Sequence, residues 1–452
     1  MKPDRIIVVG GNAAGPAAAA KAKRVNPSAQ VIMFEAGNYI STGTCEIPYV
    51  ISGEIKDYED IVYFSAASFK ESKGVDVYVN HIVEDIKRKE KIVVVRDLID
   101  NSIKEFSYDT LVLTTGSTAR LIPGFDKEYK NIFTLKNISD LIKAENYISL
   151  ESVKKAIIIG SGYIGIEACE AMNKLGLEVT LLEKEPLPLP TAEKEISEKV
   201  VGILKSSSIT FLSSIPPVEP IVKNEKIIAV KMDEKIIETD LAIIAIGFKP
   251  NTYLAQKAKL EISKKGTIKV DRKLRTSDRN IFAAGDNIEF VNRITNKPDY
   301  FPLATYARSF GHIAGENAAG GNVNAEPVIR NVSVKIFDSF YASVGITGKE
   351  AEFYGIGFSS VTAEVRNLVN VMPGSRKVFG KIIFNRENKK ILGASFLGGR
   401  EVSGYADLLS SLIYLSQPIN MLEMIDYNYT PPLSPFTNLL YVLSRKSGKK
   451  SN

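Results

Sequence analysis

The sequence predicts an α/β fold: two doubly wound dinucleotide-binding (Rossmann-like) domains followed by a C-terminal α+β domain. Three observations lead to this prediction. A strand, a glycine turn, a helix and a second strand occur in the same order twice along the chain. Strand-rich segments follow each of these units, and the composition becomes strand-rich again from about residue 326.

The first of the two units opens the chain. IIVVGGNAAGPAAAAKAKRV reads as a strand, a glycine turn and an alanine-rich helix, and QVIMFE reads as the next strand. Glycines at such a turn permit the tight bend, let backbone N–H groups approach a pyrophosphate, and let the helix pack close to the strand. Asn12 stands where the motif has its middle glycine. The predicted contacts of the first nucleotide are Gly10, Asn12, Ala14, Gly15 and Glu35.

The second unit, KAIIIGSGYIGIEACEAMNKL followed by LEVTLLE, has a complete glycine motif. One such motif also occurs in ordinary βα turns, but two copies, each with an acid ending the second strand, indicate two separate nucleotide sites. An acid at that position repels a 2′-phosphate, so Glu183 favours NADH over NADPH, and Lys184 weakens this preference. The predicted contacts of the second nucleotide are Gly160, Gly162, Gly165 and Glu183.

The remaining segments complete the predicted domains. Strands are expected within residues 75–116 and 227–247, and a strand-rich block with helices after it begins near residue 326. The first nucleotide domain is therefore predicted to be split, at 1–117 and 245–325. The second spans 118–244, and the α+β domain spans 326–452.

The composition narrows the class of protein. The net charge of +6 comes from basic residues that are scattered apart from a short C-terminal tail, which is not typical of a nucleic-acid-binding face. No apolar run approaches the roughly 20 residues of a membrane helix, and no signal peptide is evident. Cys45 and Cys169 do not form a disulfide framework, and no metal site is predicted. We expect a cytoplasmic protein that binds neither nucleic acid nor membrane.

Three further motifs carry a family resemblance. LVLTTG at 111–116, IIAIGFKPN at 243–251 and NIFAAGDN at 280–287, in this order with the two glycine turns, resemble the pyridine nucleotide–disulfide oxidoreductases up to about residue 435. The resemblance implies FAD at the first site, NADH or NADPH at the second, and a C-terminal dimerisation domain that makes a homodimer. It also implies cofactor contacts from Thr115, Gly116, Gly247, Gly285 and Asp286.

Two residues after the second glycine turn also take an expected role from the family. Tyr163 is expected to cover the flavin until the nicotinamide arrives, although packing explains this residue equally well. Glu167, on the same helix, is expected to contact the nicotinamide side.

The segment YISTGTCEIPYVISG at 39–53 is similar to the one-cysteine box of the coenzyme A disulfide reductases and NADH oxidases. One thiol cannot store an electron pair as an internal disulfide, so Cys45 must form a mixed disulfide with a small thiol or a sulfenic acid. The first implies an enzyme that reduces a small disulfide or persulfide, with coenzyme A as the thiol. The second implies an oxidase or peroxidase that uses oxygen or peroxide. We favour the reductase.

The thiolate is the reactive form of cysteine, so we expect the pKa of Cys45 to lie below its ordinary value, lowered by a helix that starts at Cys45 and includes Pro48. Cys169 is spaced like a packing residue. Basic residues on the first helix, Lys21, Lys23 and Arg24, are candidates for the phosphates of a coenzyme-A-type ligand.

Three departures from the family pattern bear on this reading. Glu46 replaces a small residue beside the thiol, and Val371, Met372 and Pro373 stand where coenzyme A disulfide reductases have Tyr-Tyr-Pro. NYTPP keeps Tyr429, which in the family reaches the partner's active site, so Tyr429 joins Cys45 as a predicted catalytic residue. A redox-sensing flavoprotein without turnover, or an electron-transfer reductase, remains an alternative of another class.

Overall fold

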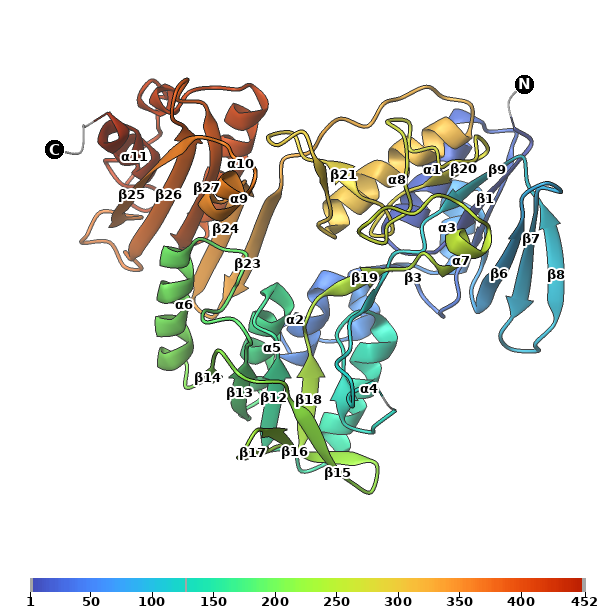
Figure 1. The fold of residues 1–452 in the computed structure, drawn as a ribbon, viewed down its shortest axis with the longest axis horizontal. Coiled ribbons are helices and arrows are strands. Elements are labelled where there is room, and N and C mark those ends of the chain that lie inside the picture. The colour runs from blue at the N-terminus through green and yellow to red at the C-terminus, as the bar shows by residue number, and fades with distance from the viewer. Residues whose placement is uncertain (1–2, 127, 449–452) are drawn as a thin grey trace.

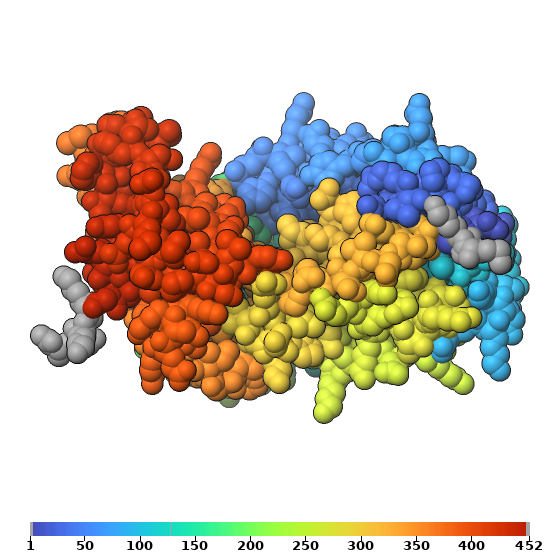
Figure 2. All heavy atoms as spheres, turned by 90° about the horizontal axis from the view of Figure 1, so that it is seen from above, coloured from blue at the N-terminus to red at the C-terminus, as the bar shows by residue number. Residues whose placement is uncertain are grey.

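The computed structural model describes residues 3–126 and 128–448, so the tail residues Lys449 and Lys450 lie outside the described part. Figure 1 shows two α/β units, one drawn in blue and yellow and one in green, and a C-terminal unit in orange and red. Seen from above, the C-terminal unit occupies one end of the molecule and the first α/β unit occupies the other (Figure 2).

The first unit is built on a parallel five-stranded sheet with the order β20-β9-β1-β2-β5. Its helices α1 and α8 pack so closely that a Cβ at Gly315 would lie 2.1 Å from the carbonyl oxygen of Ala18. The elements are β1 (Arg5–Val9), α1 (Ala14–Val25), β2 (Gln30–Phe34), α3 (Ala66–Lys73), β5 (Asp76–Tyr78), β9 (Thr110–Leu113), α7 (Tyr253–Lys257), β20 (Ile281–Ala283) and α8 (Ala304–Ala318).

The second unit has its own parallel sheet, with the order β11-β18-β12-β13-β14. The chain then returns to the first sheet with β20, so the first unit is discontinuous in sequence. The exact domain limits stay a prediction. The elements are β11 (Ile132–Phe133), α4 (Ile138–Leu150), β12 (Lys155–Ile159), α5 (Tyr163–Lys174), β13 (Glu178–Leu182), α6 (Lys194–Ser206), β14 (Thr210–Leu212) and β18 (Leu241–Ile244).

Short antiparallel pieces flank these two sheets. The three-stranded pieces are β6 (His81–Lys87), β7 (Ile92–Asp97), β8 (Ile103–Ser107) and β15 (Glu219–Lys223), β16 (Lys226–Met232), β17 (Lys235–Glu238). The strand pairs are β3 (Ile40–Thr42) with β4 (Val62–Phe64), β10 (Ser117–Ala119) with β19 (Phe248–Pro250), and β21 (Phe290–Val291) with β22 (Pro298–Asp299).

The C-terminal unit is an antiparallel sheet with helices, which confirms the predicted α+β class. Its strand order is β23-β24-β27-β26-β25, and α10 packs against β24 and β27. The elements are β23 (Asn331–Ile336), β24 (Ser339–Gly345), α9 (Gly348–Phe353), β25 (Phe358–Arg366), β26 (Lys377–Asn385), β27 (Ile391–Gly398), α10 (Glu401–Tyr414) and α11 (Leu439–Ser447).

Ion pairs join the C-terminal sheet to the second unit. Lys381 on β26 contacts Glu193 at 2.8 Å, and Lys199 on α6 contacts Glu364 on β25 at 2.7 Å. The C-terminal unit is thereby fixed beside the second nucleotide-binding sheet. In the described part of the chain, no helix has the combined length and apolar character that crossing a membrane requires.

Candidate functional site

The first glycine turn, between β1 and α1, can be built only with glycine at two positions. Gly10 has φ +110°, and a Cβ there would lie 2.1 Å from the carbonyl oxygen of Thr114. A Cβ at Gly15 would lie 1.8 Å from the carbonyl oxygen of Gly10. Glu35, just after β2, braces the turn by accepting the N–H of Gly11 at 2.6 Å. The close strand–helix contact that a bound pyrophosphate needs is therefore present.

Asn12 does more than replace a glycine in this turn. Its Oδ1 accepts the N–H of Ala13 at 3.0 Å and the N–H of Thr42, also at 3.0 Å. Thr42 ends β3, three residues before Cys45. The Asn12 side chain therefore ties the first nucleotide turn to the segment that carries the thiol.

The predicted closing residues of the first site come together around the ends of β9 and β20. A Cβ at Gly285 would lie 3.0 Å from the Cβ of Ala14, so Gly285 sits directly against the first turn of α1. Asp286 accepts the hydroxyl of Ser117 at 2.7 Å and pairs with Lys136 at 3.2 Å.

Two kinds of loop surround this site: loops with free space beside a glycine, and loops held by side-chain hydrogen bonds. Gly116 and Gly247 have positive φ angles, of +65° and +95°, and a Cβ at either would meet nothing within 4 Å. Thr115 donates its hydroxyl to the carbonyl of Asn251 at 2.6 Å. Asn287 donates to Thr115, and its Oδ1 is a buried acceptor without a hydrogen-bond partner among the described residues. Open glycines and an unpaired acceptor fit a site that takes a polar ligand.

The second glycine turn has the same packing and an open approach. A Cβ at Gly160 would lie 2.5 Å from the carbonyl oxygen of Ala245, and one at Gly165 would lie 1.9 Å from that of Gly160. At Gly162, which precedes α5, a Cβ would meet nothing within 4 Å. The backbone at Gly162 is thus accessible to a phosphate, as the helix N-terminus favours.

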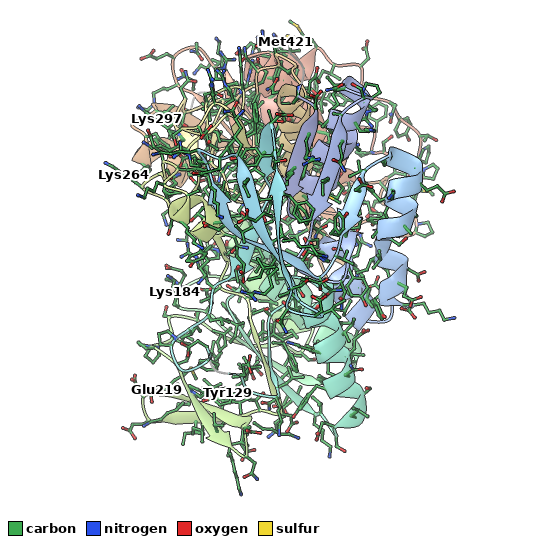
Figure 3. All side chains as sticks on the ribbon, turned by 90° about the vertical axis from the view of Figure 1, so that its right-hand side faces the viewer. Tyr129, Lys184, Glu219, Lys264, Lys297 and Met421 are labelled. Carbon is green, nitrogen blue, oxygen red and sulfur yellow. The ribbon has the colours of Figure 1, made fainter. Side chains whose placement is uncertain are left out.

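Glu183, just after β13, is 5% exposed and accepts three hydrogen bonds from its own chain. The N–H and hydroxyl of Ser161 donate at 2.8 and 2.6 Å, and the N–H of Glu185 donates at 2.9 Å. Glu183 therefore shapes the turn, and its role at the ribose of the second nucleotide stays a prediction. Lys184, whose side chain is 81% exposed, lies at the surface of the second unit (Figure 3).

Cys45 lies on an exposed turn beside the first site. It is in a short 3₁₀ turn, Thr44–Glu46, followed by α2 (Ile47–Ile51), and Pro48 lies in the first turn of α2 as expected. Ile47 and Val50 are buried and anchor the segment. Cys45 is thus exposed to solvent on a turn that buried neighbours hold in place.

The expected low pKa of Cys45 is wrong for the protein chain by itself. Protein atoms crowd the sulfur although the residue has exposed surface, and this desolvation raises the pKa of Cys45, with Glu46, Glu167 and Asp286 raising it further. Lys136 opposes them. Helix α2 has five residues and begins after Cys45, so it does not supply the dipole that the sequence led us to expect.

Glu167 is a desolvated carboxyl near this turn. It lies on α5, and burial raises its pKa to about 7, with Tyr49 and Lys335 lowering and Glu170 raising it. Tyr49, on α2, donates its hydroxyl to Glu167 at 3.3 Å. Lys335 on β23 pairs with Glu170, and its Nζ lies 5.8 Å from the ring centroid of Tyr49. All three units therefore meet around Glu167.

Tyr163 and Cys169 lie on the same helix as Glu167. The ring of Tyr163 stacks on that of Tyr341 at 6.3 Å and meets Phe301 edge-on at 6.2 Å. Cys169 is fully buried, as expected for a packing residue.

Tyr429 is not brought to Cys45 within the chain. It is 48% exposed, and its ring contacts Phe436 at 5.5 Å. Of the basic candidates on α1, Lys21 pairs with Glu316 at 2.9 Å, and Lys23 donates to the carbonyl of Ala29 at 2.8 Å. Lys23 is therefore turned to its own helix end rather than offered to a ligand.

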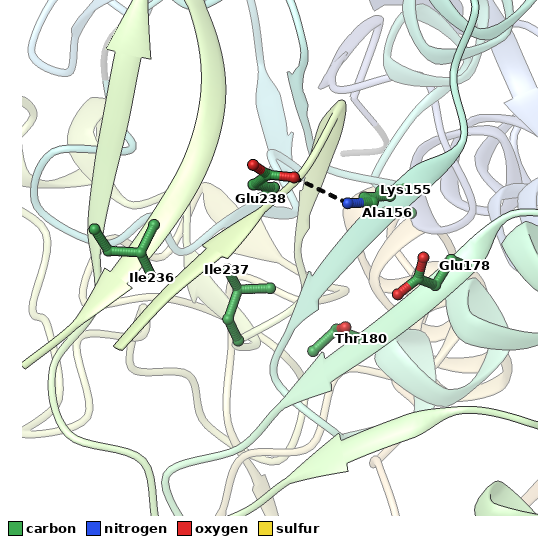
Figure 4. Close-up of a pocket in the computed structure, with 7 residues that line it drawn as sticks. All are labelled: Lys155, Ala156, Glu178, Thr180, Ile236, Ile237 and Glu238. Atoms are coloured by element: carbon green, nitrogen blue, oxygen red, sulfur yellow. Dashed lines mark hydrogen bonds and ion pairs between the residues drawn. The ribbon is translucent and has the colours of Figure 1, made fainter. Parts of the chain in front are cut away.

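A cavity of about 480 Å³ lies away from these groups. It is at the start of β12 and β13, whereas the glycine turn follows the end of β12. Its lining is drawn in Figure 4: Lys155, Ala156, Glu178, Thr180, Ile236, Ile237 and Glu238. A much smaller cavity, of about 10 Å³, is lined by Gly285, Asp286 and Phe301 among others, and it belongs to the first site.

Sequence reasoning missed the residues that act through tertiary contacts. Lys136, which pairs with Asp286, and Tyr49, which bonds to Glu167, were not singled out, although Tyr49 lies in the cysteine box. Their partners are 150 and 118 residues away in sequence, so no local pattern points to them.

Comparisons with known proteins agree with this geometry. Residues 4–309 match the family described as pyridine nucleotide-disulphide oxidoreductase, and residues 332–434 match its dimerisation domain. An NADH oxidase of Methanocaldococcus jannaschii is 31% identical over 99% of both chains. A coenzyme A disulfide reductase of Staphylococcus haemolyticus is 29% identical over 98% of this chain and 99% of its own. An NAD-dependent persulfide reductase structure from A. fulgidus superposes with a TM-score of 0.93 at 30% identity, covering 98% of this chain and 83% of that one.

Proposed function

The chain belongs to the pyridine nucleotide-disulphide oxidoreductase family, and from that premise we propose that it reduces a small disulfide or persulfide with NAD(P)H through Cys45. The family uses FAD and NAD(P)H, and the two glycine turns fit these two dinucleotides. One observation carries the proposal: an exposed thiol lies three residues after Thr42, whose N–H donates to Asn12 in the first glycine turn.

The overall reaction balances with one pair of electrons. NAD(P)H, a proton and a disulfide RSSR give NAD(P)⁺ and two thiols RSH. FAD, when bound, supplies the transfer of an electron pair from the hydride to sulfur. The Cys45 thiolate attacks RSSR, forms the mixed disulfide Cys45–S–S–R and releases RS⁻. Two electrons then cleave this bond and return the Cys45 thiolate and a second RS⁻. The proton left by the hydride and one proton from solvent convert the two RS⁻ to RSH.

Several residues support binding rather than chemistry. Glu35 and Glu183 each brace a glycine turn near the predicted ribose positions, and the acid at Glu183 favours NADH. Of the three basic candidates on α1, Arg24 remains for the phosphates of a coenzyme-A-type acceptor, since Lys21 pairs with Glu316 and Lys23 donates to the carbonyl of Ala29. The relative named as a coenzyme A disulfide reductase supports this choice of acceptor.

The proposal is tested with the purified FAD-loaded protein. We expect a yellow protein whose flavin absorbance is bleached by NADH. We also expect the mass of the protein to fall on treatment with dithiothreitol, by the mass of a coenzyme-A-type thiol released from Cys45. Anaerobic assays with coenzyme A disulfide, coenzyme A persulfide and peroxide, and a parallel assay in air-saturated buffer, then identify the acceptor. Turnover with peroxide or oxygen alone, with no thiol released from Cys45, would overturn the reductase proposal.

An oxidase or peroxidase is the second candidate, favoured by the 31% identity to an NADH oxidase over nearly the whole chain. In that case Cys45 cycles through a sulfenic acid, and air-saturated buffer sustains NADH consumption. An electron-transfer reductase without a role for Cys45 would instead keep full NADH-to-acceptor activity in Cys45→Ser.

We also propose a homodimer in a reducing compartment such as the cytoplasm. The match to the dimerisation domain supports the dimer, and exposed apolar side chains near Tyr429 are the candidates for its contact. They are Met424, Tyr429, Leu433 and Phe436. Both cysteines are free thiols in the structure, which agrees with the compartment.

A further inference from the structure

Three aromatic rings from three parts of the fold meet between the two nucleotide sites. Tyr163 is the first residue of α5, Phe301 precedes α8, and Tyr341 lies on β24. The Tyr163 ring stacks on Tyr341 with an interplanar angle of 17° and meets Phe301 at 67°. Tyr341 is fully buried, so it offers the Tyr163 ring a fixed wall.

A buried cation holds the other side of this cluster. The guanidinium carbon of Arg330 lies 5.6 Å from the centroid of the Phe301 ring, and its side chain is 14% exposed. Asp299 lies 3.5 Å from its Nε, and Glu350 accepts from its Nη2. Glu350 is itself fixed by the N–H of Thr347 at the start of α9, at 2.8 Å.

The ion pairs do not fully satisfy Arg330. Its Nε is buried and has no hydrogen-bond partner among the described residues, although a carboxylate oxygen of Asp299 lies 3.5 Å away. Buried donors are nearly always paired in folded proteins. The guanidinium is therefore held by Glu350 and by its contact with the Phe301 ring rather than by a hydrogen bond to Asp299.

The cluster lies next to both predicted nucleotide sites. Tyr163 follows Gly162, whose backbone opens onto free space, and Phe301 lines the small cavity that also includes Gly285 and Asp286. Burial raises the pKa of Tyr163, while the charge of Arg330 acts to lower it, so the phenol lies within the electrostatic reach of the guanidinium. Any movement of the Tyr163 ring must disturb Phe301, Tyr341 or both.

We propose that Arg330 is a positioning residue that fixes the ring of Tyr163 through Phe301, between the two nucleotide sites. The proposal rests on the proposed function for the presence of FAD, but not on the identity of the electron acceptor.

The test uses flavin emission from the FAD-loaded protein, because a tyrosine close to a flavin quenches its fluorescence and a phenylalanine does not. The Tyr163→Phe variant gives the reference emission of a flavin without this quencher. Arg330→Met removes the charge and the planar group beside Phe301. We expect the flavin emission of this variant to rise by at least half of the difference between wild type and Tyr163→Phe. Arg330→Lys keeps the charge but not the planar fork, and we expect a smaller rise of the same sign.

Arg293→Met is the matched control, since the guanidinium carbon of Arg293 lies 3.8 Å from the centroid of the Tyr414 ring and the side chain donates to the carbonyl of Tyr414 rather than to a residue of the cluster, and its emission should equal that of wild type. The double variant Tyr163→Phe, Arg330→Met should match Tyr163→Phe alone. Equal emission in wild type and Arg330→Met would overturn the proposal, as would an added rise in the double variant. If Arg330→Met does not fold, the Arg330→Lys comparison decides by the same criteria. A protein that binds no FAD contradicts the proposed function instead.

Discussion

The side-chain oxygen of Asn12 accepts the N–H of Thr42 at 3.0 Å, and this bond joins the first nucleotide turn to the segment of the reactive cysteine. The two residues are 30 positions apart in sequence. Because the same oxygen also accepts the N–H of Ala13, one amide fixes both the start of α1 and the end of β3. One side chain therefore links the first glycine turn to the segment that carries Cys45.

Asn12→Ala should loosen the cysteine segment. The change leaves the N–H groups of Ala13 and Thr42 without their acceptor, which costs about 1–2 kcal/mol of unfolding free energy. We expect lower stability in urea and faster loss of the Cys45-dependent activity than of flavin binding. Asn12→Asp is the control: it keeps the acceptor but adds a charge near the phosphates, so FAD affinity should fall while the segment stays ordered. Equal urea midpoints for Asn12→Ala and wild type would contradict this reading.

Glu46→Gln should lower the pKa of Cys45, because the Glu46 carboxylate is the strongest charged group that raises it, after desolvation. Lys136→Met should raise the pKa, because the ammonium of Lys136 stabilises the thiolate. The pH dependence of Cys45 alkylation by iodoacetamide measures both shifts. Glu59→Gln, an exposed acid on a nearby turn, should leave the profile unchanged. A raised pKa of Cys45 in Glu46→Gln, together with a lowered one in Lys136→Met, would show that other groups set the reactivity of the thiol.

Glu167 should make stability depend on pH between about 4.5 and 7. Burial raises its pKa from 4.5 to about 7, so in this window the folded protein holds a proton that the unfolded chain releases. Stability therefore falls as the pH rises through the window, by at most about 3 kcal/mol, and is level for this group above it.

The side chain in Glu167→Gln cannot ionise, so this variant should lack the part of the fall in stability that Glu167 causes. The free energy of unfolding of the variant relative to wild type should therefore be larger at pH 8 than at pH 5. Chemical unfolding at the two pH values measures the difference. Glu198→Gln, on an exposed face of α6, controls for the loss of a carboxylate. A Glu167→Gln profile parallel to that of wild type would contradict the raised pKa.

Light scattering should give the mass of a homodimer at micromolar concentration, and Phe436→Asp should weaken it. Phe436 is 81% exposed and contacts Tyr429, so a charge there would have to be buried in the expected contact. Tyr253→Asp, at a comparably exposed ring in the first unit, should leave the mass unchanged. A wild-type monomer would remove Tyr429 from the site, because Tyr429 does not reach Cys45 within its own chain.

Much of the fold followed from local sequence. The glycine turns, the β-branched strands and the change of composition near residue 326 predicted two doubly wound domains and an α+β third unit, and the strand orders confirm them. These features depend on neighbours along the chain, such as Gly10 and Gly15 in one turn. Periodicity and glycine spacing predict structure best where such short-range geometry determines it.

The finer features of the site did not follow from sequence, for specific physical reasons. The pKa of Cys45 was expected to be low, but α2 begins too late to act on it and the surrounding carboxylates come from distant segments. Lys23 looked free on a helix face and instead caps the carbonyl of Ala29. Arg330, Phe301 and Tyr163 meet only because three units of the fold converge. Contacts of this kind are tertiary, and no local pattern encodes them.

The most direct test of the central claim compares the wild type with Cys45→Ser in anaerobic buffer, with NADH as the donor and coenzyme A disulfide as the sole acceptor. We predict that wild type turns over and that Cys45→Ser loses at least about 100-fold in turnover, because it lacks the thiolate that forms the mixed disulfide. NADH should still bleach the flavin of both proteins, which shows that only the sulfur step is lost. Equal turnover in the two proteins would contradict the assignment of Cys45 as the redox centre.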